Sequence, residues 1–251
     1  MIFHGVRREI TLYASRASQL RGRATPWRKL ADTADAVVAA DFHGGDVYLL
    51  THKNAPRFKV VRVRADAAGR DTGTVVVAEG PGVLTSLAVA HDALYVQELD
   101  GGLGRIRRVP FRGGGGAVPI PLPGDGAVAS IAADRRRPGV VFPLESWVRS
   151  RRWYHYDPAH RQVRNTGVLE PAPVDVSVYT SVEVEVPSHD GVKVPLSIVY
   201  RKDIAKDSSN PTLLEGSSSP ARSISCARDT PHRSIWPAWV PARAAFSSGG
   251  R

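Results

Sequence analysis

An internal repeat of 47 residues constrains the fold of this chain more than any other feature of its sequence. The apolar pair Val47-Tyr48 recurs as Leu94-Tyr95 and again as Val141-Phe142, each time 47 residues further on. Apolar positions on either side of the pair recur at nearly the same step. The position before it holds Val37, Leu84 and Ile131 in successive units, and the position after it holds Val63, Val109 and Tyr156. A period in the forties with about four strands per unit is typical of a β-propeller blade.

Short apolar runs fill each unit and predict strands. They are four to eight residues long, rich in Val, Ile, Leu and Tyr, and bounded by Gly, Asp, Asn or Pro; examples are Ile10 to Ala14, Asp46 to Thr51, Lys59 to Val63, Thr74 to Ala78, Pro138 to Phe142 and Ser181 to Val186. Such runs with turn residues between them favour antiparallel strands, and useful helical stripes are scarce. We therefore predict an all-β chain with about three and a half units between Arg8 and Pro187. A closed ring needs more blades than that.

A basic strand recurs after the apolar pair, as in Arg105 to Val109. Because side chains alternate along a strand, we expect its arginines on the wet face of an outer strand.

The net charge of +10 raises the question of a polyanionic partner. Residues 217–251 carry net +4 and are rich in Ser, Pro and Arg without strand or helix periodicity, whereas the first 216 residues carry net +6. The excess is thus thinly spread over the regular part of the chain, and nucleic acid is not needed to explain it.

One cysteine, Cys226, excludes an intramolecular disulfide and a cysteine-based zinc site. No apolar run approaches the roughly 20 residues that a membrane helix needs. The first twelve residues, MIFHGVRREITL, place charges where a signal peptide is apolar. We therefore expect a cytoplasmic protein without a membrane segment.

Several stretches resemble the prolyl oligopeptidase family of serine peptidases. They are GDVYLLTHKNAPRFKVVRV (Gly45 to Val63), PLPGDGAVASI (Pro121 to Ile131), YTSVEVEVPSHDGVKVPLSIVYRKD (Tyr179 to Asp203) and NPTLLEG (Asn210 to Gly216). The resemblance implies a seven-bladed propeller over an α/β-hydrolase domain, with the propeller admitting short peptides. It also implies cleavage after proline or, in the related oligopeptidase B enzymes, after basic residues.

The resemblance stops at Gly216. The family continues with a Tyr-Gly-Tyr-Gly-Gly-like turn, and Ser217 stands where its oxyanion tyrosine is expected. The nucleophile elbow G-x-S-x-G does not occur anywhere in the chain. We therefore name no catalytic residue and expect no peptidase activity.

The fold that follows is a partial β-propeller of three to four blades over residues 1–178. A hairpin and strand entering the α/β-hydrolase domain follow over 179–216, and an irregular, disordered or frame-shifted tail over 217–251. The chain is then a fragment of a prolyl-oligopeptidase-like endopeptidase, whose partners are short peptides in the intact enzyme. Exposed blade faces and open sheet edges lead us to expect non-specific self-association.

Other motifs have simpler interpretations than catalysis. Ser188-His189-Asp190 contains the residue types of a triad, but neighbours on a hairpin point to alternate sides, and Asp190-Gly191 predicts a two-residue turn. His43 with His52, and His155 with His160, lack metal-binding spacing. We therefore expect no metal and no cofactor.

Two glycine runs and two basic clusters also have simpler interpretations than ligand binding. Gly101 to Gly104 and Gly113 to Gly116 lack the Lys-Ser/Thr of a phosphate loop and predict loops between strands. Arg149 to Tyr156 combines cations with aromatics, as single-strand binders do, but also alternates like a blade strand, and Arg135 to Arg137 predicts a solvated turn. We expect no nucleic-acid partner. The alternative function is a stand-alone propeller-like module that binds an acidic partner.

Overall fold

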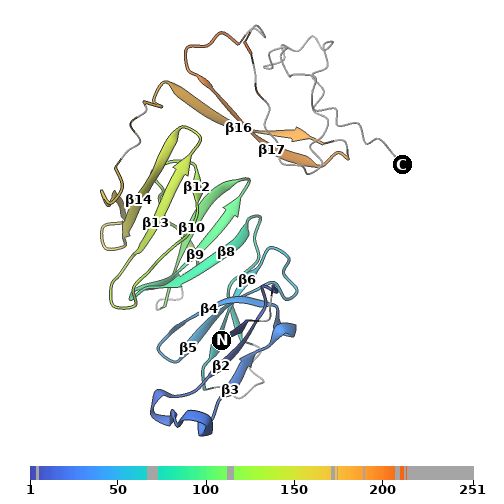
Figure 1. Ribbon diagram of the computed structural model, residues 1–251, viewed down its shortest axis with the longest axis vertical. Coiled ribbons are helices and arrows are strands. Elements are labelled where there is room, and N and C mark those ends of the chain that lie inside the picture. The colour runs from blue at the N-terminus through green and yellow to red at the C-terminus, as the bar shows by residue number, and fades with distance from the viewer. Residues whose placement is uncertain are drawn as a thin grey trace. The chain divides into compact units, whose positions relative to one another are not determined.

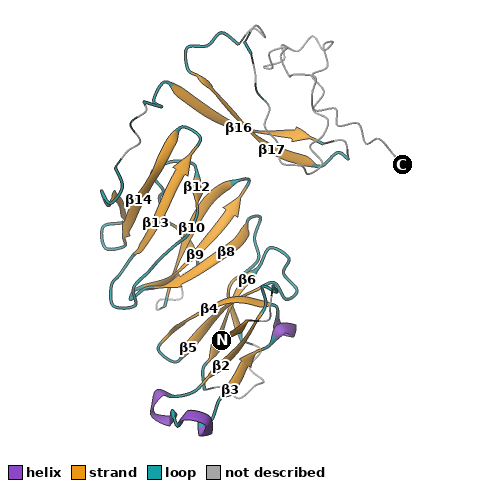
Figure 2. Cartoon of the chain, viewed as in Figure 1, coloured by secondary structure: helices purple, strands orange, loops and turns teal. Residues whose placement is uncertain are grey.

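The computed structural model describes residues 1–3, 6–66, 73–111, 116–170, 173, 175–188, 190–206, 210, 211 and 213. It is all-β, as predicted: helical turns in this part of the chain are the short 3-10 helices η1 (Ala17–Gln19), η2 (Gly22–Ala24) and η3 (Thr33–Asp35) (Figure 2). The described residues include no helix with the length and hydrophobicity that a bilayer crossing requires. The chain forms two compact units, Met1–Pro173 and Val174–Arg251.

Four antiparallel sheets follow one another along the first unit (Figure 1). The first has three strands, β1 (Ile2–Phe3), β2 (Ile10–Ala14) and β3 (Arg28–Ala31). The second consists of β4 (Val37–His43), β5 (Asp46–Thr51), β6 (Lys59–Arg64) and β7 (Thr74–Val77). The third consists of β8 (Val83–Val89), β9 (Ala93–Asp100), β10 (Leu103–Pro110) and β11 (Val118–Pro119), and the fourth of β12 (Ala127–Val128), β13 (Val140–Ser146), β14 (Arg149–Asp157) and β15 (Gln162–Asn165).

Each four-stranded sheet pairs its strands in chain order. This up-and-down order is that of a propeller blade, so the first unit is a partial β-propeller. Three complete blades and one three-stranded sheet agree with the predicted three and a half units.

The core lies between successive sheets, and the central sheets bury both faces. In β9, Leu94 and Val96 pack in one cluster with side chains of the second sheet, while Ala93 and Tyr95 pack in another with side chains of the fourth. Because alternate residues point to opposite faces, both residues of each repeated apolar pair are needed. This explains why the strands read as continuous apolar runs rather than as alternating ones.

The repeat locates one buried strand in each blade correctly, but the strand that the sequence predicts as third in its unit is second in the sheet. Tyr48, Tyr95 and Phe142 are 4%, 0% and 0% exposed and lie on β5, β9 and β13.

The positions flanking the pair are only partly right. Val37 pairs with Thr51, and Leu84 pairs with Glu98, 47 residues further on. The next residue at this step is Glu145, and its partner is Ala127 and not the predicted Ile131. On the following strand, Val63 and Val109 pair with Val47 and Leu94, whereas Val141 pairs with His155 and not with Tyr156. Paired residues of β13 and the segment before it are four positions further apart in sequence than in the second sheet, because Ala132 bridges Val141 whereas Phe42 pairs with Val47.

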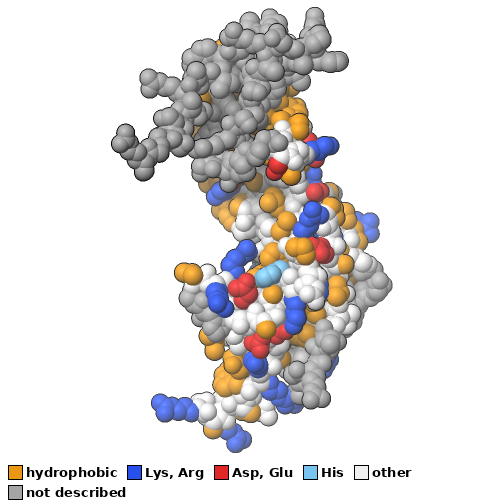
Figure 3. Space-filling model, turned by 90° about the vertical axis from the view of Figure 1, so that its right-hand side faces the viewer, with side chains coloured by type: hydrophobic (Ala, Val, Ile, Leu, Met, Phe, Trp, Pro, Cys, Tyr) orange, Lys and Arg blue, Asp and Glu red, His pale blue; other side chains and the backbone are white. Residues whose placement is uncertain are grey.

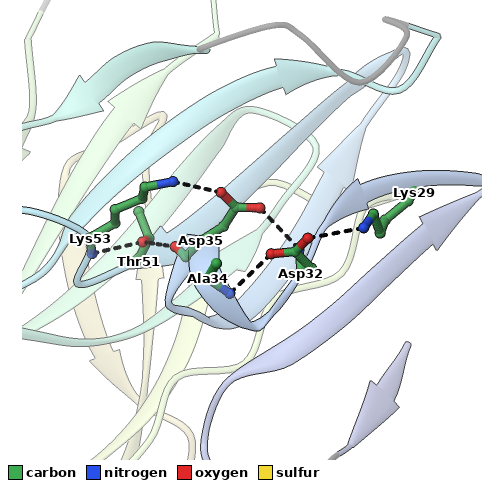
Figure 4. A network of polar contacts seen from close by, with 6 residues as sticks. All are labelled: Lys29, Asp32, Ala34, Asp35, Thr51 and Lys53. Carbon is green, nitrogen blue, oxygen red and sulfur yellow. Dashed lines mark hydrogen bonds and ion pairs between the residues drawn. The ribbon is translucent and has the colours of Figure 1, made fainter.

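A turn between the first and second sheets is fixed by paired acids (Figure 4). The Asp32 side chain accepts a hydrogen bond from Ala34 N at 3.0 Å, and Asp32 N donates to Asp35 Oδ2 at 3.0 Å, which completes a capping box. Thr51 Oγ1 donates to Asp35 O at 2.6 Å and so ties the turn to β5.

Two lysines neutralise these carboxylates. Lys29 Nζ lies 3.0 Å from Asp32 Oδ2, and Lys53 Nζ lies 2.9 Å from Asp35 Oδ1. The hydrogen bond from Lys29 is the main cause that lowers the pKa of Asp32. A lowered pKa in the folded state means that this carboxylate stabilises the fold at neutral pH, and that its contribution is lost as pH falls through the lowered value.

The described part of the second unit is a hairpin of β16 (Tyr179–Pro187) and β17 (Lys193–Arg201). The alternating run Ser181 to Val186 lies in β16, as predicted. The irregular tail predicted for residues 217–251 lies outside the described residues.

Close approach of the third and fourth sheets requires a glycine at position 104. Gly104 N donates to Gly126 O at 2.8 Å, and a Cβ at position 104 would lie 2.6 Å from Val128 N.

We expect Gly104→Ala to lower the free energy of unfolding by about 1–3 kcal/mol, because the added methyl forces two sheets apart. Urea denaturation of the full chain measures this effect. Gly116→Ala is the control, since no atom lies within 4 Å of a Cβ there. Equal stability of both variants would contradict close packing at Gly104.

Candidate functional site

Ser188 and Asp190 lie in the connection between β16 and β17. Ser188 N donates to Val192 O at 2.8 Å, and Gly191 N donates to Ser188 O at 2.9 Å. The turn that Ser188 and Val192 close therefore spans three residues, not the two predicted, and Gly191 takes a left-handed φ of 80°. The Asp190 carboxylate accepts a hydrogen bond from Val192 N, and His189 lies outside the described residues.

Four histidines considered as metal ligands lie in separate surroundings. His43 stacks on Phe111 with ring centroids 3.8 Å apart, His52 Nε2 lies 3.1 Å from Glu9 Oε1, His155 pairs with Val141 within the fourth sheet, and His160 Nδ1 lies 2.7 Å from Asp157 Oδ2. Within the described ranges, no three His, Cys, Asp or Glu side chains are grouped so that they could hold a metal ion.

The first two glycines of the first run form a turn between strands, as predicted, whereas Leu103 and Gly104 lie in β10. Gly101 and Gly102 have φ of 54° and 86° and join β9 to β10. Two successive positive φ values are those of a type I′ hairpin turn, which explains the two glycines. Of the second run, only Gly116 is described.

Contacts within its own blade occupy part of the basic cluster of β14, although Arg152 Nε is buried without a hydrogen-bond partner among the described residues. Tyr154 and Tyr156 are 8% and 5% exposed, so their rings are not available for stacking on bases. Arg151 NH2 lies 2.8 Å from Glu145 Oε1, and this hydrogen bond lowers the pKa of Glu145. On the face seen in Figure 3, basic and acidic side chains are interspersed rather than gathered by sign.

The arginines of β10 are not simply on a wet face, which corrects the sequence prediction. Arg107 NH2 lies 2.6 Å from Glu98 Oε1, and Arg108 Nε lies 2.8 Å from Asp92 Oδ2; the two arginine side chains are only 22% and 28% exposed. The strand is third of four in its sheet, between β9 and β11, and not the outermost strand that the sequence predicts.

Asp92 also joins two blades. Its Oδ1 accepts a hydrogen bond from Gly139 N at 2.8 Å, which belongs to the connection before β13. Its Oδ2 accepts from Tyr95 OH at 3.0 Å, and burial is the largest cause that raises the pKa of this tyrosine.

Asp41 is the acid that connects three blades. It lies on β4, and its Oδ2 accepts a hydrogen bond from Val89 N at the end of β8, at 2.8 Å. Its Oδ1 accepts from Phe42 N and from the guanidinium of Arg135, which belongs to the β12–β13 connection. The Arg135 guanidinium carbon also lies 3.7 Å from the centroid of the Phe42 ring, within cation–π range.

Arg135 therefore has a structural partner that the predicted solvated turn did not foresee. The 47-residue step gives no signal of this contact, because it aligns Asp41 with Ala88 and with Arg135 itself.

A pocket of about 610 Å³ lies beside Asp41, between the first and second sheets. Its wall includes aromatic side chains from three segments, Tyr13, Trp27 and Phe42, which are 36%, 56% and 53% exposed. Charged residues are mixed with them, including Arg16, Asp46 and Arg135. The sequence analysis did not find this pocket, because its residues are distant in sequence and follow no motif.

We expect Asp41→Ala to lower the free energy of unfolding by about 1–3 kcal/mol, because it leaves the buried end of β8 without an acceptor for Val89 N. Arg135→Ala removes a half-exposed ion pair and should cost less than about 1 kcal/mol. Urea denaturation of both variants measures the difference. A larger loss of unfolding free energy in Arg135→Ala than in Asp41→Ala would contradict the view that Asp41 stabilises the fold chiefly by accepting the hydrogen bond from Val89 N.

Known proteins share both sequence and fold with this chain. Residues 2–166 match the family model described as prolyl oligopeptidase, N-terminal beta-propeller domain. The prolyl endopeptidase of Elizabethkingia meningoseptica is 24% identical over 180 residues, which make up 71% of this chain and 25% of that protein. The chain thus spans a quarter of the length of this curated relative.

Solved structures share the architecture at low identity. Prolyl oligopeptidase B from Galerina marginata aligns with a TM-score of 0.67 and 20% identity, over 84% of this chain and 30% of that one. Oligopeptidase B from Leishmania major aligns with a TM-score of 0.62 and 18% identity, over 82% and 30% of the two chains. At such identities the likeness shows the fold.

Proposed function

Because the chain belongs to the prolyl oligopeptidase family, we propose that it is the substrate-gating propeller part of a serine endopeptidase that hydrolyses short peptides after proline. The observation that carries the proposal is the stack of three complete blades in chain order, together with the family match over residues 2–166. In a propeller the sheets surround a central channel. A channel of this kind admits a short peptide and excludes a chain of protein size.

The hydrolytic chemistry belongs, in this proposal, to an α/β-hydrolase domain that the β16–β17 hairpin enters. The sequence contains no G-x-S-x-G, and Ser217, where the family carries its oxyanion tyrosine, lies outside the described residues. We propose that this chain is a fragment without a nucleophile, acid or base of its own, and that it acts in the cytoplasm.

No observation favours the alternative, an independent module that binds an acidic partner. Three of the arginines that would bind such a partner already form ion pairs with acids of their own blades; they are Arg107, Arg108 and Arg151.

The full chain should not cleave a blocked Gly-Pro-p-nitroanilide reporter, since no activated serine is present. When it is added to the hydrolase domain of a family peptidase that lacks its propeller, cleavage of unfolded casein should fall while cleavage of the short reporter continues. Release of nitroaniline and gel electrophoresis of the casein measure the two activities.

Turnover by the chain alone that a serine-directed inhibitor abolishes would contradict the absence of a nucleophile. Casein and reporter cleavage that respond equally to the added chain would contradict gating.

A further inference from the structure

The pocket between the first and second sheets contains polar groups that the described residues do not satisfy. Ser15 Oγ is buried there and has no hydrogen-bond partner among those residues. Buried hydroxyl groups are normally paired, so this one points to an absent partner. Across the described part of the chain, the Asp46 carboxylate likewise makes no hydrogen bond or ion pair, although it lines the same cavity.

The cations of the pocket are not equivalent. Arg135 is held by Asp41, and Arg28 NH1 donates to the backbone oxygen of Asp66 at 2.8 Å. The guanidinium of Arg16 makes no such contact with any described residue. Arg16 acts electrostatically on Asp66, and the Asp46 carboxylate on Arg64, but neither side chain makes a hydrogen bond or close ion pair with a described residue. The pocket therefore offers one acid and one base whose hydrogen-bonding groups the described residues do not use, which complements a ligand that carries both charges.

The aromatic wall supplies the remaining contact surface. Trp27, Phe42 and Tyr13 remain one-third to one-half exposed although they line a cavity. Exposed aromatic rings in a concave site are typical anchors for apolar or prolyl side chains. A volume of about 610 Å³ lies within the range of small-ligand pockets.

We propose that this pocket binds a short peptide with free termini, with its ammonium group at Asp46, its carboxylate at Arg16 and its apolar side chains on Trp27 and Tyr13. Ser15 Oγ then hydrogen-bonds to the peptide backbone. The choice of a peptide rests on the proposed function, and the site itself is built from residues of the propeller. It gives the propeller a place where a peptide is held, in addition to a channel that it passes.

Isothermal titration calorimetry of the full chain with the tripeptide Ala-Pro-Phe tests the proposal. Asp46→Asn and Trp27→Ala should each weaken binding by about tenfold or more, because a charge-assisted contact or an aromatic anchor is lost. The matched controls are Asp100→Asn and Trp147→Ala, which alter an exposed acid and a 68% exposed tryptophan outside the pocket and should leave the affinity unchanged. Circular dichroism melts identify any variant that fails to fold.

Modified peptides test the two ends separately. Acetylation of the amino terminus should weaken binding to the unaltered chain and abolish the effect of Asp46→Asn. Amidation of the carboxyl terminus should do the same for Arg16→Gln.

The proposal is overturned if the unaltered chain shows no heat of binding at millimolar tripeptide, or if pocket and control variants lose affinity equally. This readout is separate from gating. Tripeptide binding without an effect on casein cleavage would refute only the proposed function, and gating without tripeptide binding would refute only the pocket.

Discussion

Burial of both faces of each central sheet is the constraint on which the rest of this structure depends. A four-stranded antiparallel sheet alone leaves apolar surface on each side, and it becomes stable only when neighbouring sheets cover it. Here Leu94 and Tyr95 are both fully buried although they point to opposite sides of β9. The blades therefore stabilise one another, and no blade is an independent module.

Polar contacts add order to this stack at a few defined positions. Asp41 and Asp92 each accept a backbone N–H from another blade, at Val89 and Gly139 respectively. Such contacts fix how one sheet is aligned with the next, which apolar burial alone does not specify. The pocket lies beside one of these acids, Asp41, between the first and second sheets, so the ordering of the blades also positions the aromatic and charged side chains around the cavity.

The repeat predicted the blades well because the apolar pair in each second strand is buried, Val141 only in part, with one residue on each face of the sheet. It assigned Ile131 wrongly, because paired residues of β13 and the segment before it are four positions further apart in sequence, which shifts that segment out of the 47-residue step. It also missed the partner of Arg135, since an ion pair between residues 94 positions apart leaves no local pattern. The pocket was missed for the same reason: its polar groups come from separate strands and turns, and only the packing of the sheets brings them together.

Hydrogen exchange of the backbone amides tests the central role of two-faced burial most directly. The account predicts that the amides of β9, which is covered on both faces and paired on both edges, exchange most slowly. Those of β15, at the edge of the fourth sheet, should exchange much faster. Exchange of β9 as fast as that of β15 under native conditions would contradict the claim that the blades stabilise one another through both faces.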